Sequence, residues 1–203
     1  MKIAGLILAA GGSSRMGDQN KLLQLIDGTP MVKKVVASCL HSNLSSIYVV
    51  LGHGSEWINN CISTEGINFV NNEDWRLGMA SSINSGIGAM NNDFDGAMIL
   101  LGDMPYIETK LIDQMIELFQ EYKIVVPVKN GRQGNPVLFS STFFNDLQSL
   151  DGDKGAKRVI QENFSSVVRT HVMTNAIFRD INTSQQMKDS VRTSLKVVFC
   201  NGK

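Results

Sequence analysis

Short, uninterrupted apolar runs recur along the 203-residue chain, with helical patterns between them. Such runs are typical of strands in a sheet that helices cover on both faces, because neither face then needs polar side chains. The predicted strands are Ile3–Leu8, Ser46–Leu51, Ile67–Val70, Ala97–Leu101 and Ile124–Val128. Their alternation with helices predicts a three-layer, Rossmann-like α/β fold with a doubly wound, mostly parallel sheet.

The helical segments carry their own signals. Thr29 and Pro30 offer an N-cap and a first-turn proline for the first helix. Its apolar stripe comprises Val32, Val35, Val36, Cys39 and Leu40, so we expect Cys39 to be a core residue rather than a nucleophile. A second stripe comprises Leu111, Met115, Leu118, Phe119 and Tyr122. Thr183 with Gln186 forms a capping box for a last helix near Gln185–Val191.

The segment "VKNGRQGNPVLF", residues 128–139, differs from the rest because two short strands flank a glycine-rich turn. It predicts a small β-hairpin insertion after the main sheet. We expect a single domain over residues 1–194, followed by a C-terminal tail over 195–203.

Composition excludes several classes of protein. Nineteen basic and nineteen acidic residues give zero net charge, so no broad basic field exists for nucleic acid or a membrane surface. Three widely spaced cysteines without a CxxC pair predict reduced thiols and a cytoplasmic protein. No run approaches the roughly twenty apolar residues of a membrane-spanning helix. The opening "MKIAGLILAA" loosely imitates a secretory signal, but a buried strand explains it better.

The glycine-rich stretch "GGSSRMG" after the first strand does not fit two familiar nucleotide-binding motifs. It lacks the G-x-G-x-x-G spacing of dinucleotide-binding folds, and no Asp or Glu lies between Gly28 and Ser55 to hold a ribose. Gly12 and Gly17 have the separation of a P-loop, but Asp18 stands where that motif needs lysine. Both interpretations therefore fail.

A third interpretation is a longer loop that holds a triphosphate. Glycines let backbone N–H groups approach phosphate closely, and Arg15 and Lys21 would neutralise its charge. The alternative is a structural loop with incidental cations. The spacing alone leaves both open.

Two aspartates are candidate metal ligands. Asp103 comes after the Ala97–Leu101 strand and one glycine, and ligands of doubly wound sheets bind at the carboxyl ends of strands. A carboxylate there suits Mg²⁺, which bridges one or two carboxylates to substrate phosphates. Asp103 could instead cap the next helix. Asp180 could be a second metal ligand or a turn residue.

Together these segments resemble the MobA-like nucleotidyltransferases, and among them the molybdenum cofactor cytidylyltransferases. The matching segments run in the family's order from Leu8 to about Thr183: "LAAGGSSRMG" with "NKLL", "GMASSINSGI", "LGDMP", "GRQGNPVLF", "GDKGAKRVI" and "DINT". The resemblance implies an Mg²⁺-dependent enzyme that transfers CMP from CTP to the phosphate of molybdopterin and releases pyrophosphate. It also implies a possible recipient of the product, a molybdenum hydroxylase apoenzyme.

The resemblance also assigns residues. The implied nucleotide site comprises Ala9, Ala10, Gly11, Gly12, Ser13, Arg15, Met16, Gly17, Lys21, Gly78, Ser81 and Ser82. The implied acceptor site comprises Arg132, Gly134, Asn135 and Pro136. Arg15, Lys21 and Asp103 would be catalytic, and Asp103 and Asp180 would hold the metal.

Two departures from the family pattern leave the second metal ligand and the acceptor contact open. Asn182 stands where the family often has a second aspartate, and Lys157 stands where arginine is more usual. "LAAG" rather than "LAGG" favours cytidine over guanosine. The alternatives are guanylyl transfer to molybdopterin, cytidylyl transfer to a sugar or polyol phosphate, and a non-catalytic carrier of the pterin cofactor.

Overall fold

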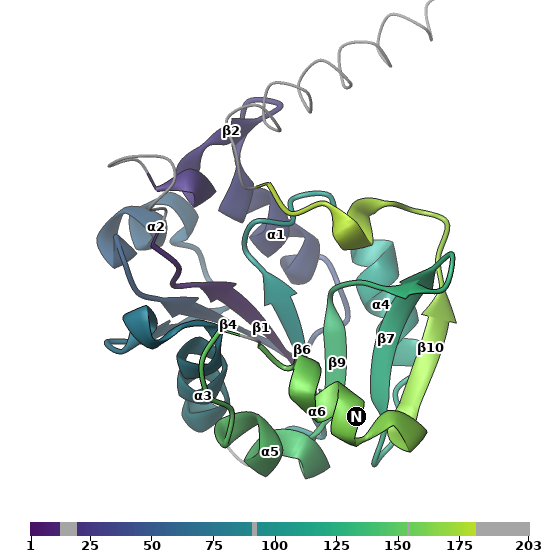
Figure 1. Ribbon diagram of the computed structural model, residues 1–203. Helices are drawn as coiled ribbons and strands as arrows, with labels where there is room; N and C mark the ends of the chain where they lie inside the picture. Colours follow the sequence, from purple (N-terminus) through teal and green to yellow (C-terminus); the bar gives the residue numbers. More distant parts are fainter. Residues whose placement is uncertain (13–19, 91–92, 154, 182–203) are drawn as a thin grey trace, which may run out of the picture.

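A computed structural model describes residues 1–12, 20–90, 93–153 and 155–181 of the chain. One large sheet runs through the molecule with helices on both of its faces (Figure 1). This is the predicted three-layer, Rossmann-like arrangement, and the sheet is mostly parallel.

The sheet has the strand order β10-β7-β9-β6-β1-β4-β5, with β8 paired to β7. The bounds are β1 Ile3–Ala9, β4 Ser46–Leu51, β5 Ile67–Asn71, β6 Gly96–Leu101, β7 Ile124–Lys129, β8 Arg132–Gln133, β9 Val137–Ser140 and β10 Val167–His171. All five predicted strands are present, each within one residue at either end. Strands β5, β4, β1 and β6 are parallel, as are β7 and β10, whereas β9 runs antiparallel between β6 and β7.

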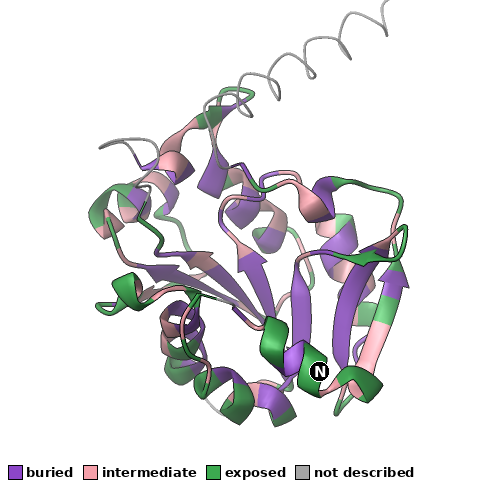
Figure 2. Ribbon diagram, in the orientation of Figure 1, coloured by how far each residue is buried: buried purple, intermediate pink, exposed green. Residues whose placement is uncertain are grey.

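Two hydrophobic cores lie on the two faces of the sheet. The side chains of β1 point alternately into the two cores: Ile3 and Ile7 lie in one, and Ala4 and Leu6 lie in the other. Helices α1 (Met31–Leu40), α2 (Ser55–Ile62) and α4 (Thr109–Glu117) cover the first face. Helices α3 (Met79–Ala89), α5 (Phe144–Gln148) and α6 (Lys157–Glu162) cover the second. In Figure 2 the inner strands of the sheet are buried along most of their length, as continuous apolar runs predict, whereas the edge strands β5 and β10 are partly exposed.

The start of α1 differs from the prediction. Thr29–Pro30 is a short strand, β3, paired antiparallel with β2 (Leu25–Ile26), and no side chain caps the helix. Asp27 and Gly28 both have positive φ and form the turn between β2 and β3. The backbone of this small hairpin therefore sets the beginning of α1, and the predicted threonine cap is wrong. Within α1 the buried stripe is as predicted except for Leu40, which is 39% exposed.

Helix α4 is shorter than its apolar stripe. It ends at Glu117, so Leu118, Phe119 and Tyr122 lie beyond it. Tyr122 has a φ of 62° and is 62% exposed, which excludes it from the helix and from the core. Phe119 is nevertheless buried.

The predicted hairpin at residues 128–139 has a different place in the fold. β7 and β8 form a hairpin whose turn is Asn130-Gly131, and both turn residues have positive φ, as tight hairpins require. The following strand, β9, lies within the main sheet between β6 and β7. The segment is thus part of the sheet rather than an addition after it.

Some predictions fall outside the described residues: the capping box, the helix near Gln185–Val191, and the domain limits at 194 and 195. Among the helices that the structure describes, none combines the length and apolar character needed to cross a bilayer.

Candidate functional site

The carboxyl ends of β1 and β6 meet at one edge of the sheet. Leu8 and Leu101 are paired in the parallel ladder, and Gly102 N donates a hydrogen bond to Leu8 O at 3.0 Å. The chain runs from β1 to β4 and then to β5, all on one side of β1. It then passes back over β4 and β1 to reach β6 on the other side of β1. This is the topological switch point where doubly wound folds bind ligands.

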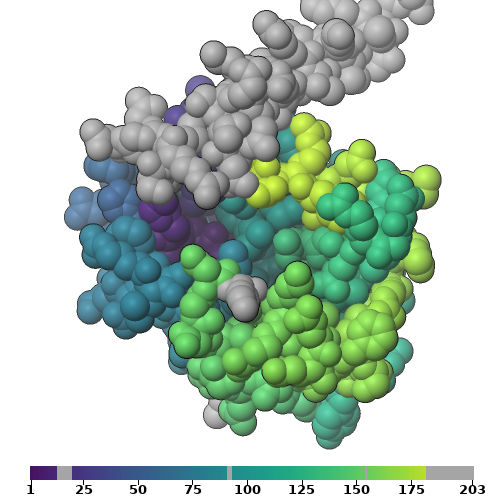
Figure 3. All heavy atoms as spheres, in the orientation of Figure 1, coloured from purple at the N-terminus to yellow at the C-terminus, as the bar shows by residue number. Residues whose placement is uncertain are grey.

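A cavity of about 900 Å³ lies at this edge. In the space-filling view, purple atoms of the N-terminal part of the chain lie deep in a hollow between blue and green segments (Figure 3). The lining comprises Leu8, Ala9, Ala10, Gly11, Gly12, Asn20, Lys21, Leu22, His53, Trp57, Trp75, Arg76, Gly78, Met79, Ser82, Leu101, Asp103 and Asp153. A volume of this size is typical of a site for a nucleotide-sized ligand.

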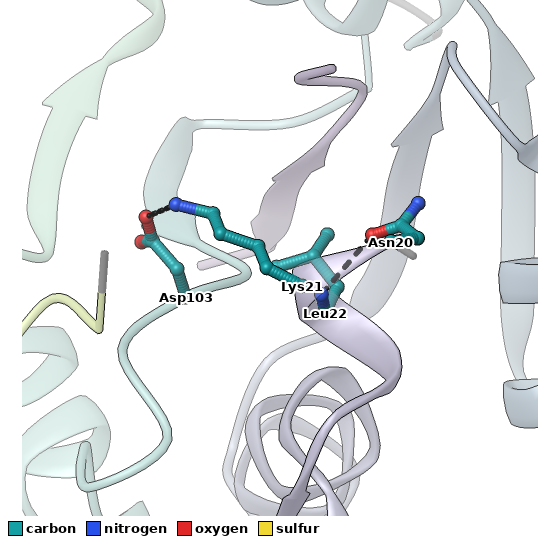
Figure 4. Close-up of polar contacts among 4 residues, drawn as sticks. All are labelled: Asn20, Lys21, Leu22 and Asp103. Atoms are coloured by element: carbon teal, nitrogen blue, oxygen red, sulfur yellow. Dashed lines mark hydrogen bonds and ion pairs between the residues drawn. The ribbon is translucent and has the colours of Figure 1, made fainter. Parts of the chain in front are cut away.

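An ion pair forms part of the cavity lining. Lys21 Nζ donates to Asp103 Oδ2 at 2.7 Å, and the two side chains are 21% and 19% exposed. Figure 4 shows Lys21 reaching across from the short 3₁₀ helix Lys21–Leu23 to Asp103 beyond the end of β6. The two residues predicted to act together are therefore in direct contact.

Asn20 holds the 3₁₀ helix that begins at Lys21 in place. Its side-chain oxygen accepts from Leu22 N at 3.0 Å, and its amide donates to His53 O at 3.3 Å. Asn20 is 5% exposed, so this capping contact is shielded from water and holds the 3₁₀ helix beside the loop after β4 (Figure 4). Asn20 begins the segment "NKLL", but nothing in the sequence predicted its capping role.

The Asp103 carboxylate has an oxygen left for a ligand. Oδ1 is buried and has no hydrogen-bond partner among the described residues. A buried carboxylate oxygen without a partner is costly, and it is the hard donor that Mg²⁺ or Mn²⁺ prefers. Ile181 N donates to Asp103 O at 3.0 Å, so the backbone next to Asp180 is tied to Asp103. Asp180 itself is exposed. The residues fit a divalent cation held by one carboxylate, with a second carboxylate in the adjoining segment.

Seven of the predicted nucleotide residues line the cavity: Ala9, Ala10, Gly11, Gly12, Lys21, Gly78 and Ser82. Ser13, Arg15, Met16 and Gly17 lie outside the described residues.

The two adjacent serines of α3 face different ways. Ser81 lines a smaller hollow of about 260 Å³, and its hydroxyl lies 2.9 Å from Asp74 O and from Gly78 O. Ser82 lines the large cavity, is 6% exposed, and accepts from Asn72 Nδ2 at 3.1 Å. Ser82 rather than Ser81 is thus the serine that a ligand in the cavity would meet.

The predicted acceptor residues do not line the cavity. Gly134 N donates to Pro127 O at 2.9 Å, and Asn135 N donates to Ile177 O at 3.0 Å. Pro136 is buried, and the exposed Arg132 places its guanidinium 4.9 Å from the Phe178 ring centre. The segment 132–136 therefore packs on the 3₁₀ helix Ala176–Phe178, which leads along the chain to Asp180.

Aromatic side chains form another part of the lining, a feature that the sequence did not reveal. The His53 and Trp75 rings are 5.2 Å apart, and the Arg76 guanidinium lies 4.4 Å from the Trp75 ring centre. A Cβ on Gly12 would come within 2.7 Å of the Trp75 ring, so this glycine lets the loop after β1 lie against the indole. The tryptophan next to an arginine, three residues before "GMASSI", is the signal that could have located these aromatic residues.

Cys39 is not a site residue. It is 1% exposed in α1, and burial raises the pKa of its thiol to about 12. A thiol with such a pKa is protonated at neutral pH and is a poor nucleophile. The prediction that Cys39 belongs to the core is confirmed.

Comparison with characterised proteins finds relatives that match most of this chain. It is 29% identical over 171 residues to the bifunctional protein GlmU of Syntrophomonas wolfei subsp. wolfei. The match covers 80% of this chain but 38% of that protein, so the chain spans about two-fifths of the relative's length.

Two solved structures share the fold over nearly the whole chain. The first is a homologue, from Mycobacterium sp. strain JC1, of Rv0371c of Mycobacterium tuberculosis. It is 25% identical with a TM-score of 0.85, covering 96% of this chain and 98% of that one. The second is Rv0371c of Mycobacterium tuberculosis H37Rv in complex with manganese. It is 20% identical with a TM-score of 0.80, covering 95% and 100% of the two chains.

The family is decided by the sequence profile of the MobA-like NTP transferase domain, which matches residues 5–167. The matched region contains β1, the loop after it, Lys21, Asp103 and the first turn of α3. The protein belongs to the family of MobA-like NTP transferases.

Proposed function

We propose that this nucleotidyltransferase transfers CMP from CTP to the phosphate of molybdopterin and releases pyrophosphate. One observation carries the proposal: the Lys21–Asp103 pair lies at the carboxyl ends of β1 and β6, beside the glycine backbone that follows β1. A cation, a carboxylate with a buried oxygen and bare N–H groups around one cavity suit a triphosphate with a divalent ion. The choice of cytidine and of molybdopterin rests on the sequence resemblance.

In this proposal the chain's own residues position the phosphates. The N–H groups of Gly11 and Gly12 and the Lys21 ammonium hold the triphosphate, and Asp103 with Asp180 would hold Mg²⁺. When bound, the metal supplies positive charge against the charge that develops on the phosphates. Lys21 must turn from Asp103 toward the phosphates, and its ammonium then lowers the repulsion between the two anionic substrates.

The reaction needs little acid–base chemistry from the protein. A phosphate oxygen of the acceptor attacks the α-phosphorus of CTP, a new P–O bond forms, and the bond to the β-phosphate breaks. The acceptor phosphate is already an anion at neutral pH, so no strong general base is required. Catalysis of this kind is mostly positioning and charge stabilisation.

The decisive experiment supplies molybdopterin, Mg²⁺ and one of CTP, GTP, ATP or UTP, and measures pyrophosphate release and product mass. We expect a cytidylylated pterin with CTP and at most slight turnover with the other nucleotides. A guanylylated product would show that the nucleotide donor is GTP rather than CTP. Cytidylyl transfer to a sugar or polyol phosphate but not to molybdopterin would change the acceptor.

A carrier without catalysis gives a different result. Calorimetry would then detect pterin binding and no binding of any nucleoside triphosphate. Delivery to a molybdenum hydroxylase apoenzyme is a further part of the proposal, supported by the chemistry of the product alone.

A further inference from the structure

The first turn of α3 is capped by a loop distant in the sequence. The first N–H groups of a helix have no partners within it, and the N-cap residue of α3, Gly78, has no side chain to supply one. Met79 N donates to Asp153 Oδ1 at 3.1 Å, and Ala80 N donates to Gly152 O at 3.1 Å. A carboxylate 74 residues away thus takes the role of the missing cap.

Glycines on both sides make this contact possible. Gly78 has a φ of 101°, a region that L side chains rarely adopt, and a Cβ there would fall on the Asp153 carboxylate. A Cβ on Gly155 would come within 2.7 Å of Met79 Sδ. The turn before α3 and the loop around Asp153 therefore approach each other at backbone distance.

The capped turn forms part of the wall of the large cavity. Gly78, Met79, Ser82 and Asp153 all line it. Ser82 lies three residues after Met79, hence on the same side of the helix. Its oxygen accepts from Asn72, and no described residue accepts its hydroxyl hydrogen. That hydrogen can be donated to a ligand, and its direction depends on where the first turn is held.

The charge of Asp153 indicates which end of a nucleotide lies here. A carboxylate at a helix N-terminus is stabilised by the helix dipole, but it repels phosphate. Two described cations line the cavity: Lys21 pairs with Asp103, whereas the Arg76 guanidinium lies over the Trp75 ring. The triphosphate is therefore favoured near Lys21, and the uncharged nucleoside near Asp153 and Ser82.

We propose that Asp153 is a positioning residue of the nucleotide site, which holds the first turn of α3 so that Ser82 meets the nucleoside. The proposal rests on the proposed function only in that the chain binds a nucleoside triphosphate in this cavity. It does not depend on which nucleotide or acceptor is used.

The test is a double-mutant cycle on binding. Calorimetry with Mg²⁺ and no acceptor measures the Kd of the tightest-binding nucleotide among CTP, GTP, ATP and UTP. We expect Asp153→Ala to raise this Kd about tenfold, the size of effect expected when one charge-assisted hydrogen bond is lost. Asp153→Asn should stay within about threefold of the native chain, because its amide oxygen still accepts from Met79 N. Adding Asp153→Ala to Ser82→Ala should change Kd less than about twofold, since both changes remove one interaction.

The control is Asp151→Ala. Asp151 lies two residues from Asp153, is exposed, and lines the smaller hollow, so its removal should leave Kd unchanged. If Asp153→Ala is unfolded at the assay temperature, Asp153→Ser, whose hydroxyl is too short to reach Met79 N, takes its place in the cycle.

Each contrary result has a distinct meaning. A native Kd in folded Asp153→Ala, or effects of Asp153 and Ser82 that multiply, would overturn the positioning role. Equal losses in Asp153→Asn and Asp153→Ala would also overturn it, because the charge itself would then contact the ligand. A native chain that binds none of the four nucleotides would overturn the proposed function and this role with it.

Discussion

At the scale of single residues, the Lys21–Asp103 pair is better explained by function than by stability. Both side chains are about one-fifth exposed, and pairs in such surroundings contribute roughly 0–1 kcal/mol. Asp103 also keeps a buried oxygen without a described partner, which costs stability. A carboxylate held in this state is suited to a ligand that arrives with the substrate.

We therefore expect Asp103→Asn and Lys21→Ala each to slow pyrophosphate release at least about a hundredfold, as loss of a preorganised charge does. Asp95 provides a matched control, because it lies just before the amino end of β6 whereas Asp103 lies just beyond its carboxyl end. Asp95→Asn should keep release within about twofold, because the residue contacts Lys2 N at the opposite edge of the sheet. Near-native release from folded Asp103→Asn and Lys21→Ala would remove the pair from the active site.

At the scale of elements, α3 joins the second core to the cavity. Its buried face packs on β1, and a Cβ on Gly86 would collide with the side chain of Leu6, which is fully buried. Gly88, one residue beyond Ile87, is exposed, and the nearest atom to a Cβ there is Gln148 Nε2 at 3.7 Å. The two glycines of one helix thus have different reasons to be there.

Replacing Gly86 or Gly88 by alanine should change the free energy of unfolding in opposite directions. Gly86→Ala should lower the free energy of unfolding by about 1–3 kcal/mol, because the buried leucine cannot yield without strain. Gly88→Ala should raise it by up to about 1 kcal/mol, since alanine is the better helix former and has room. Urea denaturation of the two variants beside the native chain measures both. A neutral Gly86→Ala would mean that α3 and β1 separate easily.

At the scale of the whole molecule, the two cores make stability sensitive to any charge that forms inside them. Cys39 lies in the core between α1 and the sheet, and burial raises the pKa of its thiol from 9.0 to about 12. Below pH 9 the folded and unfolded states both keep the thiol proton. Between pH 9 and 12 the unfolded state loses it first, so folding stability falls as pH rises.

The thiol alone should cost the native protein about 1.4 kcal/mol of unfolding free energy between pH 8 and pH 10. Cys39→Ala, which is less stable at neutral pH because it leaves a small void, should lack this component. Urea denaturation of both proteins at pH 8 and pH 10 gives the difference, in which the other titrating groups cancel. Parallel losses in the two proteins would show that Cys39 titrates in the folded state at its ordinary pKa.

Local pattern was enough to predict much of the fold. Continuous apolar runs located the strands, and helical spacing identified Cys39 as core, because both depend on which faces of one segment are buried. The same patterns misplaced the start of α1 and the end of α4. A small hairpin sets the first, whereas α4 ends at Glu117 and the chain reaches a positive φ only at Tyr122. Neither is visible in hydrophobic spacing.

The sequence by itself determined the layers, the parallel sheet and the presence of a glycine loop and an aspartate at strand ends. These features follow from the residue types and their spacing within a single segment of the chain. Only the tertiary structure decided that β9 enters the sheet antiparallel, that Ser82 rather than Ser81 faces the cavity, and that Asp153 caps α3. Lys21 and Asp103 are 82 residues apart, and Met79 and Asp153 are 74 apart. Contacts of this kind arise when separate elements pack together, so no local pattern encodes them.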